Sequence, residues 1–399
     1  MAKVFSDNAS PFKSLSVLIA VAFVDMLGFA MIFPLLPFYA LDLGISPQSI
    51  GLIIASFSIA QLLSAPLWGR VSDRYGRRPA LLIGLLASAV SFVVFAFADS
   101  FTLLLASRVI QGAGGGTTGV LHAYVADTVS PKDRARSLGW ISAATSAGTM
   151  IGPVIGSTAA YWGQAAPGLV AACLCFINVV FAWSRLEESA TGEKIISQER
   201  KPIWLAAWTI VRDPRARVSR LIWIYALGML SFSTFTSVIT LFLGMDFNVT
   251  ERNIGYVFLY VGFLGVFMRT LVLGPAVDRL GEIWTMRIGA VSLIVGLVSY
   301  PFATGFWSLA IMMPLMPIGT ALLFPSTTAQ TSRWAEESEL GTIMGTAQSF
   351  AGMSRVIAPL IATTLFQQQG HGSPFFVGAG YMVVVLALSF GIGDARKAR

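Results

Sequence analysis

Runs of apolar residues, each about 20 residues or longer, follow one another along the chain and are separated by short polar segments. About 20 apolar residues in a helix span the hydrocarbon core of a bilayer. Backbone polar groups in lipid are satisfied only within helices or closed barrels. The pattern therefore predicts an all-α membrane protein with twelve transmembrane helices. We expect these helices near residues 14–40, 48–68, 79–98, 101–124, 137–160, 167–185, 218–244, 251–273, 284–303, 306–328, 341–366 and 374–393.

The order of small, charged and proline residues repeats along the chain at an offset of about 206 residues. Residues 139–153 align with residues 345–359, and each segment begins with Gly and ends with Pro. Residues 42–51 align with residues 246–255, and each begins with Asp and ends with Ile-Gly. Parallel repeats of six helices are one known transporter architecture, with the substrate site near the bilayer midplane between the repeats.

The repeat predicts two pseudo-symmetric six-helix bundles, at 1–186 and 218–399, joined by a cytoplasmic linker at 187–217. If both termini are cytoplasmic, the inside segments hold 23 of the 27 basic residues, and the outside loops hold only Arg252. Such an asymmetry is the positive-inside signature. It predicts a multi-pass protein of the cytoplasmic (inner) membrane with both termini in the cytoplasm.

Composition supports a membrane protein and argues against other classes. The chain is 55% hydrophobic and 12% charged, with a mean hydropathy of +0.72, whereas soluble domains carry about 25% charged residues. The net charge of +7 does not indicate nucleic-acid binding, because the basic residues fall in short loops between apolar runs. The only histidines are His122 and His371, and we find no metal motif and no nucleophile with a base. We therefore expect no enzyme activity, no metal site and no cofactor.

The loop between the second and third predicted helices, Gly69–Pro79, reads GRVSDRYGRRP. It carries one carboxylate, Asp73, among four arginines, so it must lie at a membrane face. A second, degraded copy at Gly274–Trp284 reads GPAVDRLGEIW and repeats the pattern Gly-x-x-x-Asp-Arg-x-Gly. The loop thus marks the same position in both predicted bundles.

Two opposite charges lie deep within apolar runs of the first bundle. Asp25 is the only carboxylate in such a position, and Arg108 lies in the fourth predicted helix. A charge within the membrane needs a partner or a water-filled cavity, so we predict that the two residues pair. Burial disfavours an ionised carboxylate, whereas a nearby guanidinium favours it. A conformational change that alters the hydration of Asp25 or its distance from Arg108 would therefore load and release a proton. The alternative is a permanent structural ion pair.

The fifth predicted helix carries small residues at helical spacing in Gly148-Thr-Met-Ile-Gly152-Pro153-Val-Ile-Gly156. Glycines four residues apart leave a smooth face that another helix can approach closely. Pro153 removes one backbone hydrogen bond and can bend the helix.

With these motifs the chain resembles the major facilitator superfamily over nearly its whole length, and in detail the twelve-helix drug/proton antiporter branch that includes bacterial tetracycline exporters. Besides the loop and the Gly148–Gly156 segment, the matching motifs are Arg108–Gly112 and Asp25–Pro37. The resemblance implies alternating access, with the glycine face of the fifth helix against the eighth helix. It also implies a conformational latch in which Arg77 reaches Asp127. The implied latch residues are Gly69, Asp73, Arg74, Gly76, Arg77, Arg78 and Asp127.

The resemblance favours a secondary active transporter that exports small, drug-like amphiphiles, in exchange for protons, as a monomer in the lipid bilayer. The cavity walls are expected from the first, fourth, seventh and tenth helices, where a Met- and Phe-rich stripe suits loosely specified amphiphiles. The same stripe could be helix–helix core. With two further arginines, the candidate cavity residues are Met26, Phe29, Phe33, Gln111, Tyr225, Met229, Phe232, Arg269, Met313, Met316 and Arg355, and Phe324 belongs to the same stripe.

Two features depart from the tetracycline exporters. Arg269 and Arg355 have no obvious acidic partner in the second bundle, and the ninth predicted helix lacks the additional acidic residue of those exporters. The alternative is therefore a transporter of an anionic or zwitterionic amphiphile, such as a lipid, a lysolipid, a siderophore or an organic anion, held by these arginines. They could instead bind backbone carbonyls. A non-transporting membrane receptor on the same fold is a minor alternative.

Overall fold

The computed structural model describes residues 11–116, 118–130, 133–189, 203–214, 216–336 and 339–392. For residues 11–14, 118, 135 and 203–207 within these ranges only the backbone is described. The middle of the predicted linker lies outside the described residues.

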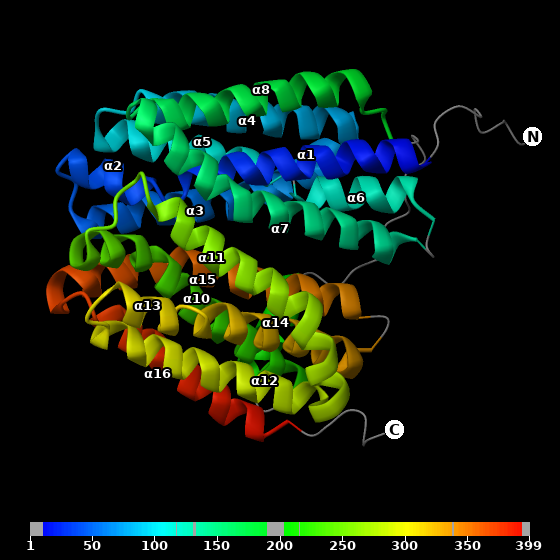
Figure 1. Cartoon of the computed structure of the whole chain (residues 1–399). Coiled ribbons are helices and arrows are strands. Elements are labelled where there is room, and N and C mark those ends of the chain that lie inside the picture. Colours follow the sequence, from blue (N-terminus) through cyan, green and yellow to red (C-terminus); the bar gives the residue numbers. More distant parts are fainter. Residues whose placement is uncertain are drawn as a thin grey trace, which may run out of the picture. The chain divides into compact units, whose positions relative to one another are not determined.

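The described residues form helices joined by turns, with no strand among them (Figure 1). In chain order the helices are α1 (Pro11–Ile32), α2 (Leu36–Asp42), α3 (Pro47–Tyr75), α4 (Arg77–Ala96), α5 (Phe101–Gly115), α6 (Thr118–Thr128), α7 (Arg134–Ala159), α8 (Ala166–Arg185), α9 (Ile203–Arg212), α10 (Arg217–Phe247), α11 (Ile254–Phe267), α12 (Leu273–Ser299), α13 (Phe306–Met312), α14 (Leu315–Trp334), α15 (Leu340–Gln369) and α16 (Ser373–Phe390). Two 3₁₀ turns follow α7 and α12, and a π-turn, Met268–Val272, joins α11 to α12.

The predicted all-α membrane class is confirmed. Ten stretches of the described residues are long and apolar enough to cross a membrane. One of them, Ile254–Phe302, covers nearly all of both the eighth and the ninth predicted helices. The fourth predicted helix, 101–124, does not count among the ten, because it is divided into the shorter α5 and α6. The number of twelve spans therefore stays a prediction.

The predicted helices break where proline or glycine disfavours a continuous helix. Pro34 lies in the turn between α1 and α2, and Pro314 lies between α13 and α14; a proline lacks the backbone donor that an uninterrupted helix needs. Gly116 caps the end of α5. Gly281 interrupts α12 with φ of 79°, in the region that glycine adopts readily and other residues do not.

The chain divides into two compact units. The first unit consists of Met1–Leu43, Ile59–Lys194 and Glu251–Leu259. The second consists of Gly44–Ser58, Ile195–Thr250 and Tyr260–Arg399. Each unit thus follows one predicted bundle except for a short segment taken from the other sequence half. The bundle boundaries at 186 and 218 stay predictions.

In the first unit α1 packs against α7 and α8, and α4 packs against α5 and α8. Its core joins apolar residues of α1, α4 and α6, such as Leu18, Leu85 and Val125, with Ala182 of α8. In the second unit α10 packs against α14, α15 and α16, and α12 packs against α14 and α16. These packed faces position the charged and aromatic side chains described below.

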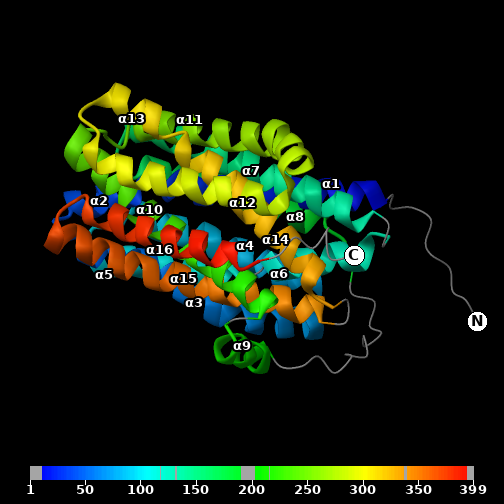
Figure 2. The ribbon, with the colours of Figure 1, turned by 90° about the horizontal axis from the view of Figure 1, so that it is seen from below.

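The short helix α9 packs against α10 and α15 of the second unit (Figure 2). Its Ile210 is buried against Ile222 and Ala347. Trp208 and Val211 are exposed on another side of the same helix. An amphipathic helix with an exposed tryptophan suits the membrane interface, as the predicted position of the linker requires.

Candidate transport site

Asp25 of α1 is partly buried in the first unit. Its carboxylate accepts a hydrogen bond from the buried hydroxyl of Ser88 on α4, and Cys175 of α8 is a close electrostatic neighbour. Within the part of the chain that the structure describes, no basic side chain forms an ion pair with this carboxylate. Asp25 therefore has a neutral hydroxyl, and no cation, as its partner.

Arg108 is buried elsewhere in the same unit. Its guanidinium carbon lies 5.2 Å from the centre of the Phe95 ring on α4, and its Nε lies 3.4 Å from the Ser107 hydroxyl. One terminal nitrogen has no partner among the described residues. The predicted Asp25–Arg108 ion pair is therefore wrong for this conformation. Ser88 and Phe95, the neighbours of the two charges, are two turns apart on α4, a rise of about 10 Å along the helix axis.

The glycine face of α7 packs against α1, and not against the eighth predicted helix. A Cβ at Gly148 would lie 2.6 Å from the carbonyl oxygen of Phe23, and a Cβ at Gly152 would lie 2.7 Å from that of Leu27. At Gly156 it would meet the carbonyl of Met31. The implied contact with the eighth helix therefore does not involve the three glycines; within the motif it is made by Pro153, as described next. The glycines are needed because α1 and α7 approach at backbone distance.

A neighbouring side of α7 does contact α11. The backbone N–H of Gly255 donates to the Ser157 hydroxyl at 2.9 Å, and a Cβ at Gly255 would lie 2.5 Å from the carbonyl oxygen of Pro153. Pro153 and Ser157 are four residues apart and share one side of α7. This contact, the Gly255 joint, lies within the first unit and explains why that unit includes residues 251–259.

The second unit contains the repeat of this contact. A Cβ at Gly51 of α3 would overlap the Thr363 hydroxyl and would lie 2.7 Å from the carbonyl oxygen of Pro359. The Gln48 N–H, one turn earlier, donates to the Gln367 side chain at 3.0 Å. Pro359 and Thr363 correspond in the repeat to Pro153 and Ser157. This contact is the Gly51 joint, and each joint has room only for glycine.

The loop before α4 forms a clamp around Arg77. Its guanidinium pairs with Asp127 at 3.0 Å and with Asp73 at 2.5 Å, and it donates to the Ser72 hydroxyl at 2.8 Å. The predicted contact between Arg77 and Asp127 is confirmed. Glu188, which no sequence motif indicated, accepts a hydrogen bond on its carboxylate from the backbone N–H of Arg77 at 2.8 Å. A carboxylate at a helix N-terminus is stabilised by the exposed N–H groups. The start of α4, which has no acidic residue in its first turn, could have indicated that a carboxylate from elsewhere in the chain binds there.

The remaining loop residues have simpler surroundings. Gly76 adopts a φ of 105°, which favours glycine. Arg78 donates to the Trp183 carbonyl of α8. Arg74 lies over the ring of Tyr75, and nothing lies within 4 Å of a Cβ built at Gly69. The latch role of the whole set stays a prediction.

In the first unit the predicted cavity residues of α1 and of the turn that follows it are partly buried. Met26, Phe29 and Phe33 share this state, and the two phenyl rings stack at 5.7 Å. Gln111 of α5 is buried, and its side-chain carbonyl oxygen has no partner among the described residues. An unpaired buried acceptor is costly, so Gln111 is suited to meet a ligand or a water molecule.

In the second unit an aromatic and polar patch forms where α10, α14 and α15 meet. Tyr225 packs edge-on against Phe324 at 5.5 Å, and Phe232 packs against the same ring at 6.3 Å. The Gln348 amide donates to the Tyr225 hydroxyl at 3.4 Å. Arg355, two turns further along α15, is exposed and has Tyr225 as its electrostatic neighbour. We call these five residues the second-unit patch.

Other predicted cavity residues have different surroundings. Met313 and Met316 are 5% and 2% exposed, so they pack as buried core residues in this conformation, and their place in the cavity wall stays a prediction. The methionine spacing could not distinguish a helix–helix contact from a cavity wall. Met229 is partly buried. Arg269 is exposed and lies in the π-turn after α11, a type of irregularity that is frequent at functional sites.

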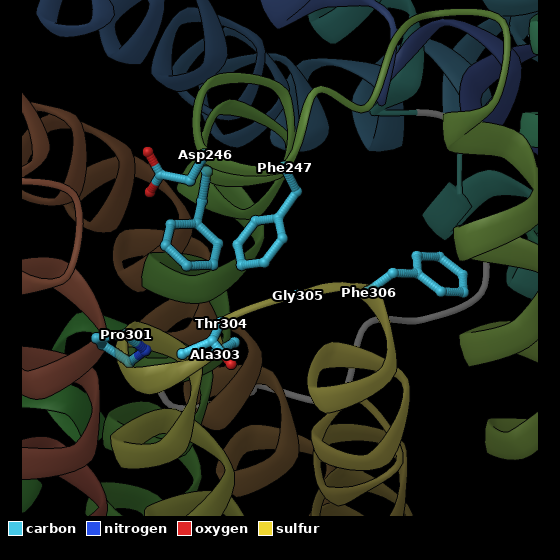
Figure 3. A pocket seen from close by; sticks show the side chains of 8 residues that line it. Asp246, Phe247, Pro301, Ala303, Thr304, Gly305 and Phe306 are labelled. Carbon is cyan, nitrogen blue, oxygen red and sulfur yellow. The ribbon is translucent and has the colours of Figure 1, made fainter.

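A separate cavity of about 400 Å³ opens at the end of the second unit where α10 ends (Figure 3). The Phe247 side chain points toward the turn that contains Pro301 and Thr304, and the Asp246 carboxylate points away from it (Figure 3). Asp246 contacts the His371 imidazole at 2.6 Å. None of the predicted cavity residues lines this pocket. It lies at helix ends, so it differs from the predicted midplane site.

The family follows from sequence comparison. The model of the Major Facilitator Superfamily matches residues 18–274 and 221–398, which together cover nearly the whole chain. The chain belongs to this superfamily. It is therefore a multi-pass membrane transporter of small molecules, and not an enzyme.

Individual superfamily members resemble the chain over almost their full length. The class C tetracycline resistance protein of Escherichia coli is 30% identical over 392 residues, which are 95% of this chain and 97% of the relative. Multidrug resistance protein 2 of Bacillus subtilis (strain 168) is 26% identical and shares 94% of this chain and 93% of its own. Quinolone resistance protein NorA of Staphylococcus aureus (strain MSSA476) is 27% identical over 89% of this chain and 90% of its own.

Solved structures share the superfamily fold. The human organic anion transporter MFSD10 (TETRAN) matches with a TM-score of 0.70 and 23% identity over 96% of this chain and all of that chain. The nucleoside transporter NupG matches with a TM-score of 0.77 and 13% identity over 94% of this chain and 98% of its own. At these identities the likeness concerns the fold alone.

Proposed function

We propose that this superfamily member exports small, drug-like amphiphiles in exchange for protons by alternating access. It works as a monomer in the cytoplasmic membrane, with both termini in the cytoplasm. Support for the substrate class comes from the relatives, which are resistance proteins against tetracycline, quinolones and multiple drugs. One observation supports proton exchange: the Asp25 carboxylate lies inside the first unit with Ser88 as its partner and without a cation.

The coupling step uses residues of the first unit. A carboxylate partly removed from water and without a cationic partner, such as Asp25, is favoured to take up a proton. Entry of water beside Asp25, or movement of α1 along α4 toward Arg108, would stabilise the ionised form and release that proton. Because Arg108 lacks an acidic partner here, its charge is available to Asp25 in another conformation. Asp25 thus carries the proton, and Arg108 is the group that the cycle brings nearer to it.

The purified protein in liposomes is expected to concentrate its substrate when a pH step is applied. For one proton exchanged per neutral substrate, each unit of pH difference supports an accumulation of up to about tenfold. Uptake of tetracycline, norfloxacin and ethidium is followed with and without the step, and empty liposomes are the control. Substrates that only equilibrate, at the same level with and without the step, would contradict proton exchange.

A second candidate is transport of an anionic or zwitterionic amphiphile. Arg355 favours it, because it is exposed within a membrane helix, forms no ion pair among the described residues, and belongs to the second-unit patch with Tyr225 as its neighbour. A charge in such a position faces a water-filled cavity or a ligand. Guanidinium binds a carboxylate or phosphate through two parallel hydrogen bonds.

Replacement of Arg355 distinguishes the two candidates. If the substrate is anionic, Arg355→Gln should remove the thermal stabilisation given by lysophosphatidylglycerol and leave that given by ethidium unchanged. Arg355→Lys, which keeps the charge and loses the fork geometry, should retain part of the anionic response. Unchanged stabilisation by the anionic lipid in Arg355→Gln would exclude this candidate. The shift in melting temperature measures each response.

A further inference from the structure

Arginines join the helices of the second unit at its inner end, the end at which α10 begins and α14 and α16 end. The guanidinium of Arg217, at the start of α10, lies 4.3 Å from the centre of the Trp334 ring at the end of α14. The next residue toward the start of α14, Arg333, pairs with Glu282 of α12 at 2.7 Å. These two contacts connect α10 to α14 and α14 to α12.

Two more arginines connect α16 to α12 and to α10. Arg287 of α12 donates from Nη2 to the Ser389 carbonyl at 3.1 Å and lies 4.5 Å from the centre of the Phe390 ring, both on α16. Arg220 of α10 donates from Nη1 to the Gly391 carbonyl, just after α16, at 2.7 Å. The contacts therefore run from α10 to α14, α12, α16 and back to α10. We call Arg217, Arg220, Arg287 and Arg333 the arginine ring.

The surroundings of Glu282 indicate that the contacts of the arginine ring are specific. It is 4% exposed, it follows the positive-φ residue Gly281, and it also accepts from the Gln330 amide at 2.8 Å. Its position near the start of the helical segment after Gly281 suits a carboxylate, because the exposed N–H groups there favour negative charge. A buried carboxylate is retained only when it is paired and hydrogen-bonded, and Arg333 and Gln330 provide both.

The first unit repeats part of the arrangement with the charges exchanged. There the residue after Gly76 is Arg77, and its partner at the end of α6 is Asp127. At the repeat position the residue after Gly281 is the acid, and the base lies at the end of α14. Arg78 also contacts an α8 carbonyl, and Arg287, about one turn beyond the repeat position of Arg78, contacts an α16 carbonyl. The link between the start of one helix and the end of another is thus kept although acid and base have exchanged places, which indicates that the link itself matters.

A simpler explanation is that these arginines only set membrane topology. The positive-inside rule counts lysine and arginine alike. The observed contacts, however, use features that lysine lacks. Two guanidiniums stack on aromatic rings, and Arg287 uses two nitrogens on one residue, Ser389. A planar guanidinium stacks and donates in a fork, whereas an ammonium is a compact, strongly hydrated point charge.

We propose that the arginine ring fixes the inner ends of α10, α12, α14 and α16 as one rigid body. The ring residues are positioning residues, because they hold α10 and α14 in the relative placement that brings Tyr225 against Phe324. This consequence rests on the proposed role of the second-unit patch. The rigidity itself does not, and it is measured without a substrate.

Arginine-to-lysine substitution tests the proposal while keeping the charge that sets topology. Arg287→Lys and Arg333→Lys, alone and combined, are compared with Arg279→Lys, whose exposed side chain on the same helix has no partner among the described residues. Hydrogen–deuterium exchange is measured on the full protein in nanodiscs. We expect the double variant to exchange about fivefold faster or more at residues 282–289 and 383–390. We also expect faster exchange around Tyr225 and Phe324, and wild-type exchange in Arg279→Lys.

The outcomes separate the explanations. Wild-type exchange in the double lysine variant would overturn the proposal and leave topology as the role of these arginines. Faster exchange confined to residues 282–289 and 383–390 would also overturn the positioning role, because a local structural contact would not reach Tyr225. Neither result depends on proton exchange or on the identity of the substrate. A failure here is thus distinguishable from a failure of the proposed function.

Discussion

Asp25→Asn is expected to abolish accumulation of substrate against a gradient while leaving equilibration down a gradient. The asparagine side chain has the same shape and can still accept a hydrogen bond from Ser88, but it cannot exchange a proton. The structure places this side chain beside Ser88 and close to Cys175, in the interior of the first unit. Removal of the proton site should therefore affect coupling and not folding. The accumulation ratio under a pH step is expected to fall to about one, from up to about tenfold per pH unit for the wild type.

Two controls support this interpretation. Asp25→Glu keeps a carboxylate and should retain part of the accumulation, and Asp133→Asn removes an exposed carboxylate before α7 and should retain all of it. Exchange of labelled for unlabelled substrate shows whether the variant still alternates. Full accumulation in Asp25→Asn would assign the proton to another residue.

Substitution at the glycine joints should produce the second large effect. Gly255→Ala and Gly51→Ala place a Cβ 2.5 Å and 2.7 Å from the carbonyl oxygens of Pro153 and Pro359. Real Cβ atoms do not approach backbone that closely, and overpacking of this kind typically costs about 1–3 kcal/mol. Because each joint connects segments from different halves of the sequence, alternating access requires it to open. The substitutions should therefore disfavour the conformation with closed joints, which the structure shows, relative to the conformation with open joints. A cost of about 1–3 kcal/mol shifts the equilibrium between them by roughly 5- to 150-fold.

Transport is expected to slow in both variants, because a cycle needs both conformations, while the folded protein persists in the conformation with open joints. Gly380→Ala on α16 and Gly139→Ala on α7 are matched controls, since nothing lies within 4 Å of a Cβ at either position. Transport rates and melting temperatures are compared across the four variants. If the joint variants transport at the rate of the controls, the joints do not open and close during the cycle.

Much of the fold could be predicted from the sequence because membrane helices obey a strong constraint on length and polarity. The apolar runs gave the helix positions, and the repeat predicted that Pro153 and Pro359 occupy equivalent places. The breaks at Pro34 and Pro314 were not predicted. A proline in a membrane helix is often tolerated, because neighbouring groups satisfy the freed backbone atoms.

The site was less predictable, because a sequence gives the side of a helix and not the partner it meets. The Arg77–Asp127 contact was correct, and it came from the resemblance of the Gly69–Pro79 loop to the superfamily rather than from the charges alone. The Asp25–Arg108 ion pair was wrong, because Ser88 and Phe95 hold the two groups two turns apart along α4. The arginine ring was missed, because four contacts between helices distant in sequence leave no local pattern.

Proton release on substrate binding tests most directly whether Asp25 exchanges a proton for the substrate. Purified wild-type protein in weakly buffered detergent solution, with a pH-sensitive dye, is mixed with the compound from the transport assay that it accumulates. The proposed exchange predicts the release of about one proton per bound molecule in the wild type and none in Asp25→Asn, with binding retained in both. Binding to the wild type without proton release, or equal release in both proteins, would contradict it.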